Sequence, residues 1–255
     1  CSSNGKEYYV GDDGQLVRSE WVDYDGSYYF VNSSGAKITN DWRLTTPYED
    51  EDADEEWFYF QSTGKRADNK KILYKGSTFF FDADGKMLTG WVTADGDQVV
   101  NEENSINTST TSTTYYCDET GARVESGWVY TTAPSTPDDD ADADEYWYYL
   151  KKATGKPATG KQSNINGQIY LFNEEGQMQY GWVARSDSST KNFVQLDKED
   201  EEQDMILLSE YADSEVYYCG DEDDGHAKKN KWLKTWLPSD TEEEEDDKEW
   251  FWFDK

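Results

Sequence analysis

Acidic side chains are the most abundant groups in this sequence that could take part in chemistry. The 255 residues include 55 Asp and Glu, one histidine (His226) and three cysteines. A lone histidine gives Ser–His or Cys–His nucleophilic machinery little to draw on, and the count excludes a metal site built on paired histidines. A glycosidase needs only two carboxylates, but a shaped cleft must hold them. A thin stack of short elements offers no obvious cleft, so we predict a non-enzymatic chain without a cofactor.

The carboxylates are concentrated in three acidic runs, Glu49–Glu56, Asp138–Glu145 and Glu242–Asp247. Alternating carboxylates such as Asp138, Asp140, Asp142 and Asp144 could wrap a calcium ion, which takes about six to eight oxygen ligands. However, no run carries the glycine and terminal Glu of an EF-hand loop. Runs of like charge usually form solvated loops. We favour solvated loops and keep calcium binding as the alternative.

The elements that must position these groups are short repeats. An aromatic triplet, a polar turn closing on Gly and a few residues leading to Trp recur nine times along the chain. The clearest copies run from Thr78 to Trp91 and from Ile169 to Trp182, and the other triplets start at Tyr8, Tyr28, Phe58, Tyr115, Tyr148, Tyr217 and Phe251. Aromatic runs followed by Asp, Asn and Gly are typical of β-hairpins.

A second period groups the hairpins in threes. The first two hairpins of each triad end in Trp, at Trp21 and Trp42, Trp91 and Trp128, and Trp182 and Trp232. The third follows an acidic run and opens with a Trp of its own, at Trp57, Trp147 or Trp250. A hairpin is not stable alone in water, so each must bury its aromatic face on its neighbours. We predict an all-β solenoid of about nine stacked hairpins, a single module over residues 1–255 with triads at 6–72, 73–162 and 163–255.

The composition is consistent with an aromatic core. Leu, Ile, Val and Phe are few for a chain of net charge −31, a combination typical of disorder. The 11 Trp and 19 Tyr supply the missing apolar area. The negative charge opposes binding to nucleic acid or anionic membranes, and no apolar run is long enough for a transmembrane helix. The segment least consistent with the β prediction is Glu199–Tyr211, which fits a short helix or an extra strand.

The segments Glu20–Gly35 and Thr78–Val92 resemble cell-wall-binding repeats. That family includes the choline-binding and glucan-binding modules of Gram-positive surface proteins and clostridial toxin tails. The resemblance covers nearly the whole chain apart from the acidic runs. It implies a non-catalytic module at the bacterial cell surface that binds choline-bearing teichoic acid or a surface glycan.

The resemblance also implies where a ligand would bind. In choline-binding members, the Trp after the turn Gly and the Trp that opens the next triplet form a cage. Most opening positions here carry another residue: Glu7, Tyr28, Thr78, Thr114, Ile169 or Val216. Cages are therefore implied at Trp42 with Trp57, Trp128 with Trp147 and Trp232 with Trp250, with Trp21 and Tyr28 as a weaker fourth.

Two interpretations of these rings remain open. An aromatic face attracts a quaternary ammonium by about 0.5–2 kcal/mol, and the same rings could stack on sugars. Alternatively, every ring belongs to the core, and the chain is a structural spacer or adhesion stalk whose acidic loops bind calcium. Tryptophan fluorescence separates the two, because only a binder responds to choline or an oligosaccharide.

The cysteines lead to two expectations. Cys117 and Cys219 occupy a triplet position that holds Phe30, Phe60, Phe81 and Phe172 elsewhere, so we expect both to be buried and not linked to each other. The start Cys1-Ser-Ser-Asn fits a lipoprotein cut before its lipidated cysteine, and it also fits an arbitrary start. We slightly favour the lipoprotein. The sequence does not predict the oligomeric state.

Overall fold

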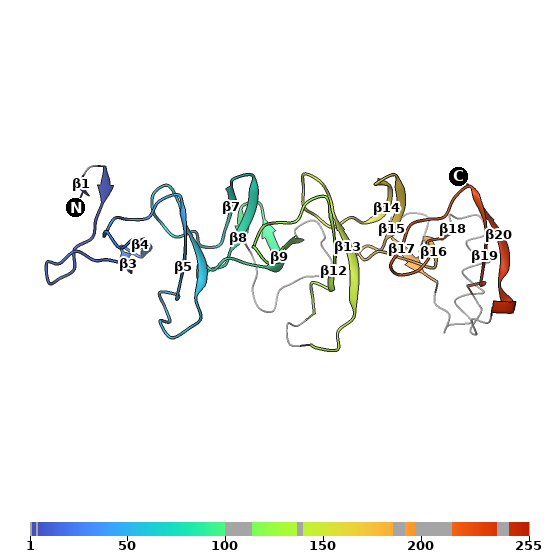
Figure 1. Cartoon of the computed structure of the whole chain (residues 1–255), viewed down its shortest axis with the longest axis horizontal. Coiled ribbons are helices and arrows are strands. Elements are labelled where there is room, and N and C mark those ends of the chain that lie inside the picture. Colours follow the sequence, from blue (N-terminus) through green and yellow to red (C-terminus); the bar gives the residue numbers. More distant parts are fainter. Residues whose placement is uncertain are drawn as a thin grey trace. The chain divides into compact units, whose positions relative to one another are not determined.

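The computed structural model describes residues 2–3, 5–99, 114–136, 140–185, 192–196, 216–238 and 245–254 (Figure 1). The chain divides into two compact units, Cys1–Ile106 with Thr113–Val124 and Asn107–Ser112 with Glu125–Lys255. Regular structure in the described residues is β apart from one 3-10 turn, η1 (Glu245–Asp247), which confirms the predicted all-β class. No helix among them is long and apolar enough to cross a membrane. Cys1 and the segment Glu199–Tyr211 lie outside the described residues.

The strands of the first unit pair as antiparallel neighbours. The short strands β1 (Ser2–Ser3) and β2 (Lys6–Glu7) pair first. Three hairpins follow: β3 (Glu20–Tyr24) with β4 (Ser27–Val31), β5 (Asp41–Thr45) with β6 (Glu56–Phe60), and β7 (Lys70–Tyr74) with β8 (Ser77–Phe81). In the last sheet, β9 (Gly90–Asp95) lies between β10 (Gln98–Val99) and β11 (Thr114–Cys117).

The second unit repeats this arrangement. Strand β12 (Gly127–Thr132) pairs with β13 (Glu145–Leu150), and β14 (Gly160–Ile165) with β15 (Gln168–Phe172). Strand β16 (Trp182–Arg185) lies between β17 (Phe193–Gln195) and β18 (Val216–Tyr218), and β19 (Lys231–Thr235) pairs with β20 (Glu249–Phe253). The acidic runs before β6 and β13 therefore connect the two strands of one hairpin.

The hairpins are offset along the chain from the positions that the sequence predicted. We expected each triplet to pair across its polar turn with the Trp that follows it. The main ladder instead joins each Trp strand to the next triplet, so that Trp21 faces Phe30 and Trp128 faces Tyr149. The polar turn closes only a single bridge, as between Val31 and Lys37.

The backbone explains this offset. After six of the polar turns, one residue donates its N–H to a carbonyl of the preceding hairpin instead of continuing its own ladder. Pro157, at the corresponding position after the Gly155 turn, has no N–H to donate. Met87 N donates to Trp57 O at 2.9 Å, and Met178 N donates to Trp147 O at 2.8 Å. We call these donors the slot residues; they are Lys37, Arg66, Met87, Arg123, Met178 and Ala227. We call the residues that accept these bonds the opening residues; in the same order they are Glu7, Tyr28, Trp57, Thr78, Trp147 and Ile169. This bond ties successive hairpins together.

Four of the slot residues lie against the turn glycine of the following repeat: Lys37, Arg66, Met87 and Met178. A Cβ added to Gly85 would lie 2.5 Å from Arg66 Cδ, and one added to Gly35 would lie 2.6 Å from Leu16 Cδ2, at the matching position of the first turn. Both glycines also have positive φ, of 75° and 81°. Glycine is therefore required at this position both for backbone conformation and for close packing.

The core of each unit includes the last residue of every triplet except the first, whose Val10 is exposed. Phe30, Phe60, Phe81, Cys117, Leu150, Phe172, Cys219 and Phe253 are all buried. This confirms that the two cysteines occupy the predicted core position. Burial raises the pKa of the Cys117 and Cys219 thiols to about 12, so neither is a reactive thiolate at neutral pH.

We therefore predict that a thiol reagent such as Ellman's reagent reacts slowly with Cys117 and Cys219 in the native protein and rapidly after unfolding. Both are free thiols in the structure. Alkylation of the unfolded, unreduced protein followed by peptide mass mapping should label both positions. Recovery of a Cys117–Cys219 disulfide peptide would contradict the assignment.

Candidate functional site

The most complete aromatic site lies in the second unit, between two successive hairpins. The rings of Trp128 and Trp147 stand at 88° with centroids 6.3 Å apart. Tyr170, from the next hairpin, lies 4.8 Å from Trp128. The slot residue Met178 closes the site, and Asp223 and Asp224 complete the lining of a cavity of about 190 Å³. This arrangement offers a cation several ring faces, a polarisable thioether and negative charge.

The two carboxylates come from a turn that is longer than its counterpart in the first unit. Gly225 N bonds to Asp221 O, four residues back, whereas Gly121 N bonds to Asp118 O, three residues back. Tyr130 Oη donates to Glu222 Oε1 at 3.2 Å and so fastens this turn to the hairpin that carries Trp128. The turn is therefore held in contact with the cage.

Asp224 is held in its charged form. Partial burial raises the pKa of its carboxyl, but contacts with Lys228 and His226 lower this pKa by more. The pKa of Asp224 therefore lies below its ordinary value. Asp224 forms an ion pair with Lys228 and a hydrogen bond with His226. At neutral pH it is a carboxylate, and its charge is already shared with Lys228. Within the described part of the chain, Asp223 forms no ion pair with a basic side chain.

A matching site lies in the first unit. Trp42 and Trp57 stand at 83° with centroids 6.4 Å apart, and Phe79 lies 4.9 Å from Trp42. Met87 packs against the same core cluster as Trp42 and Phe79. Both sites thus combine two perpendicular indoles, an aromatic ring of the next hairpin and a methionine. We call them the two methionine cages.

The other two sequence-predicted pairs differ from these. Within residues 216–238 and 245–254, Trp232 has its ring contact with Trp252, at 5.7 Å, and no ring contact with Trp250. Both Trp232 and Trp250 are exposed. The Trp21 and Tyr28 pair is covered by the Arg66 guanidinium, whose carbon lies 5.7 Å and 4.3 Å from the two ring centroids.

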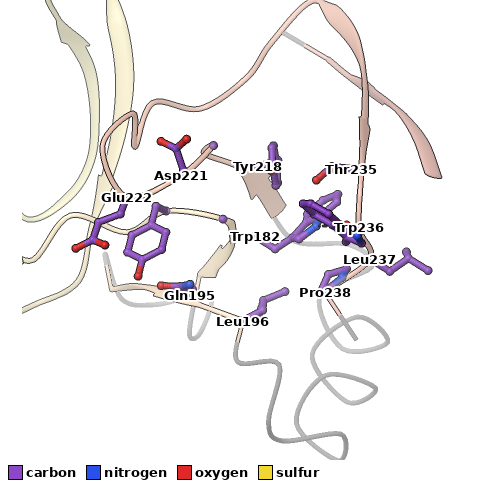
Figure 2. Close-up of a pocket in the computed structure, with 13 residues that line it drawn as sticks. Trp182, Gln195, Leu196, Tyr218, Asp221, Glu222, Thr235, Trp236, Leu237 and Pro238 are labelled. Carbon is purple, nitrogen blue, oxygen red and sulfur yellow. Dashed lines mark hydrogen bonds between the residues drawn. The ribbon is translucent and has the colours of Figure 1, made fainter. Parts of the chain in front are cut away.

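Trp182 lines a different cavity, of about 360 Å³, in the second unit. Figure 2 shows its indole close to Trp236, with Asp221 and Glu222 at the far side. The Trp182 Nε1 donates to Trp236 O at 2.7 Å, and its ring lies 5.1 Å from Phe251. Trp21 makes the same kind of bond to Thr46 O, at 2.9 Å. These two indoles are anchored as parts of the core.

The calcium candidates lie in the second acidic run. Asp138 lies outside the described residues, whereas Asp140, Asp142 and Asp144 are described. Asp142 N donates to Asp140 Oδ1 at 3.3 Å, and in the first acidic run Asp52 N donates to Asp50 Oδ1 at 3.1 Å. Among the described residues, no group of three or more His, Cys, Asp or Glu is arranged to hold a metal ion. Calcium binding stays a prediction.

The sequence predicted the tryptophan pairs of the two methionine cages but not the residues that complete these cages. Phe79, Tyr170, Met87 and Met178 come from the hairpin after each pair. The sequence does mark the slot residues, because each stands two positions after a turn glycine. The two methionines occur in Gly85-Lys86-Met87 and Gly176-Gln177-Met178. In both cases the matching opening residue is Trp.

Comparison with known proteins agrees with this architecture. Residues 19–37 match the family model of a putative cell wall binding repeat. Glucosyltransferase-S of Streptococcus mutans is 29% identical over 183 residues, which are 71% of this chain and 10% of that protein. A putative endo-beta-N-acetylglucosaminidase of Streptococcus pneumoniae is 24% identical over 141 residues, which are 55% of this chain and 16% of that protein.

A solved structure shares the fold. The crystal structure of CbpF in complex with ipratropium superposes with a TM-score of 0.50 at 18% identity, covering 96% of this chain and 62% of that one. The chain spans only about a tenth of the length of the glucosyltransferase. Residues 19–37 therefore match a cell wall binding repeat, and the described residues repeat the same kind of hairpin along both units.

Proposed function

We propose that this chain is a non-catalytic module that attaches a protein to the bacterial cell surface by binding quaternary ammonium groups on a surface polymer, such as choline-bearing teichoic acid. The observation that carries the proposal is the methionine cage of Trp128, Trp147, Tyr170 and Met178. Three aromatic faces and a thioether match the weakly hydrated surface of a trimethylammonium group. The net charge of −31 raises the local concentration of cations.

The predicted organisation in triads implies that a binding site of this kind recurs once in every three hairpins. The two methionine cages occur at corresponding places, where the acidic run joins the two strands of a hairpin. Trp232 and Trp250 occupy the corresponding positions of the third triad and stay a predicted site. In both methionine cages the completing residues come from the hairpin after the pair. The binding of several cages to one polymer would raise the overall affinity well above that of a single cage.

A neutral glycan is the second candidate ligand. A cavity of about 470 Å³ adjoins the second cage and shares Trp147 and Met178 with it. Its lining includes the amide side chains of Asn173, Gln177, Gln179 and Gln195. Amides both donate and accept hydrogen bonds, which suits sugar hydroxyls. If an oligosaccharide binds and choline does not, this cavity becomes the better site. If neither binds, the chain is a spacer.

Replacement of one ring should test the cage. Trp147→Ala removes one cation–π face and its apolar contact, worth about 1–2 kcal/mol or roughly tenfold in affinity for choline at this site. Trp91→Ala is the matched control, because Trp91 packs on Tyr116 at 5.1 Å and its hairpin opens with Thr114. It should lower the melting temperature and leave choline affinity unchanged in calorimetric titrations. Equal losses of affinity in the two variants would contradict the proposal.

We expect the carboxylates of Asp223 and Asp224 to give the two methionine cages different affinities for choline. Asp223→Asn removes a carboxylate from the lining of the second cage, so choline should bind there about two- to fivefold more weakly at low salt. Asp95→Asn, which removes the same charge from the exposed end of β9, is the control and should have little effect. Added salt should reduce the difference. A salt-independent affinity would show that the carboxylate takes no part.

A further inference from the structure

The structure holds a third aromatic cage, at the place in its repeat that corresponds to the two methionine cages. Trp21 corresponds to Trp42 and Trp128, because each pairs across its ladder with the residue two positions after the opening residue. These partners are Phe30, Tyr59 and Tyr149. Phe58, from the next hairpin, lies 4.9 Å from Trp21, as Phe79 lies 4.9 Å from Trp42 and Tyr170 lies 4.8 Å from Trp128. Tyr28 takes the place of the opening Trp.

The difference lies in the slot residue, which is Arg66. Its N–H donates to Tyr28 O at 2.9 Å, as Met87 and Met178 donate to Trp57 and Trp147. The guanidinium therefore lies in the cage itself, with its carbon 4.3 Å from the Tyr28 centroid, 5.7 Å from Trp21 and 6.0 Å from Phe58. Arg66 is 4% exposed.

The guanidinium also has anionic partners at the rim. Arg66 Nε donates to Asp68 Oδ1 at 2.6 Å, and Nη1 lies 3.3 Å from Glu49 Oε1, at the start of the first acidic run. Tyr48, one residue earlier, lies 4.8 Å from Tyr28 and covers the cage from outside. Aromatic faces and carboxylates surround this cation as they would surround a bound onium ion.

We propose that Arg66 is a built-in ligand that permanently occupies the cage of Trp21, Tyr28 and Phe58, so that the slot residue of each repeat decides whether a cage is open to an external cation. Where the opening residue is Trp57 or Trp147, the slot residue is Met and the cage is open. Where it is Tyr28, the slot residue is a cation from the chain itself. The occupied cage stabilises the fold instead of binding the polymer.

The test is to replace the internal cation with the residue that the open cages carry. The background is the double variant Trp57→Ala with Trp147→Ala, which disables both methionine cages and leaves Trp21 in place. Adding Arg66→Met should create one new site for choline, detected by calorimetry and by a change in Trp fluorescence. Because the two methionine cages are disabled, this result does not depend on whether they bind choline in the wild type.

Two controls make the outcome decisive. Lys37→Met changes the slot residue of the repeat that opens with Glu7, where no opening ring exists, and should add no site. Arg66→Ala should lower the melting temperature, and millimolar methylguanidinium should restore part of the loss by refilling the cage. A folded Arg66→Met variant that binds no choline, together with no rescue by methylguanidinium, would overturn the proposal.

Discussion

The structure depends on one backbone hydrogen bond that is repeated along each unit. The N–H of a slot residue donates to the carbonyl of an opening residue in the preceding hairpin, at 2.8 to 2.9 Å. An isolated two-stranded hairpin is only marginally stable, so this bond and the aromatic packing beneath it make the repeat a folded unit. The same bond brings each slot residue next to an opening residue of the preceding hairpin, which is aromatic at Tyr28, Trp57 and Trp147. In the function that we propose, stability and ligand binding therefore use the same contact.

This contact explains why the repeats look alike and act differently. The buried end of each triplet is nearly constant in its role, whether Phe, Leu or Cys occupies it. The opening and slot positions lie at the edge of the stack and vary without disturbing the core. Trp with Met leaves an aromatic cage, Tyr with Arg fills one, and Glu7 with Lys37 forms an ion pair instead. One scaffold thus carries open, filled and absent sites.

The sequence predicted much of the fold because its signals are local. The aromatic triplets, the turn glycines and the core position of Cys117 and Cys219 all follow from short patterns. The offset of the hairpins did not, because the Asn32–Gly35 turn looks like a hairpin loop until the hydrogen bond from Lys37 to Glu7 is known. Two of the three predicted tryptophan pairs are in ring contact, whereas Met178, Arg66 and Asp223 were not predicted. These residues reach the cages from a following repeat.

A crystal structure of the chain with bound choline would test this account most directly. We expect ligand density in the two methionine cages, beside Trp57 and Trp147, with the Arg66 guanidinium still in contact with Trp21 and Tyr28. Choline bound over Trp21 with Arg66 displaced, or choline absent from both methionine cages at saturating concentration, would contradict it.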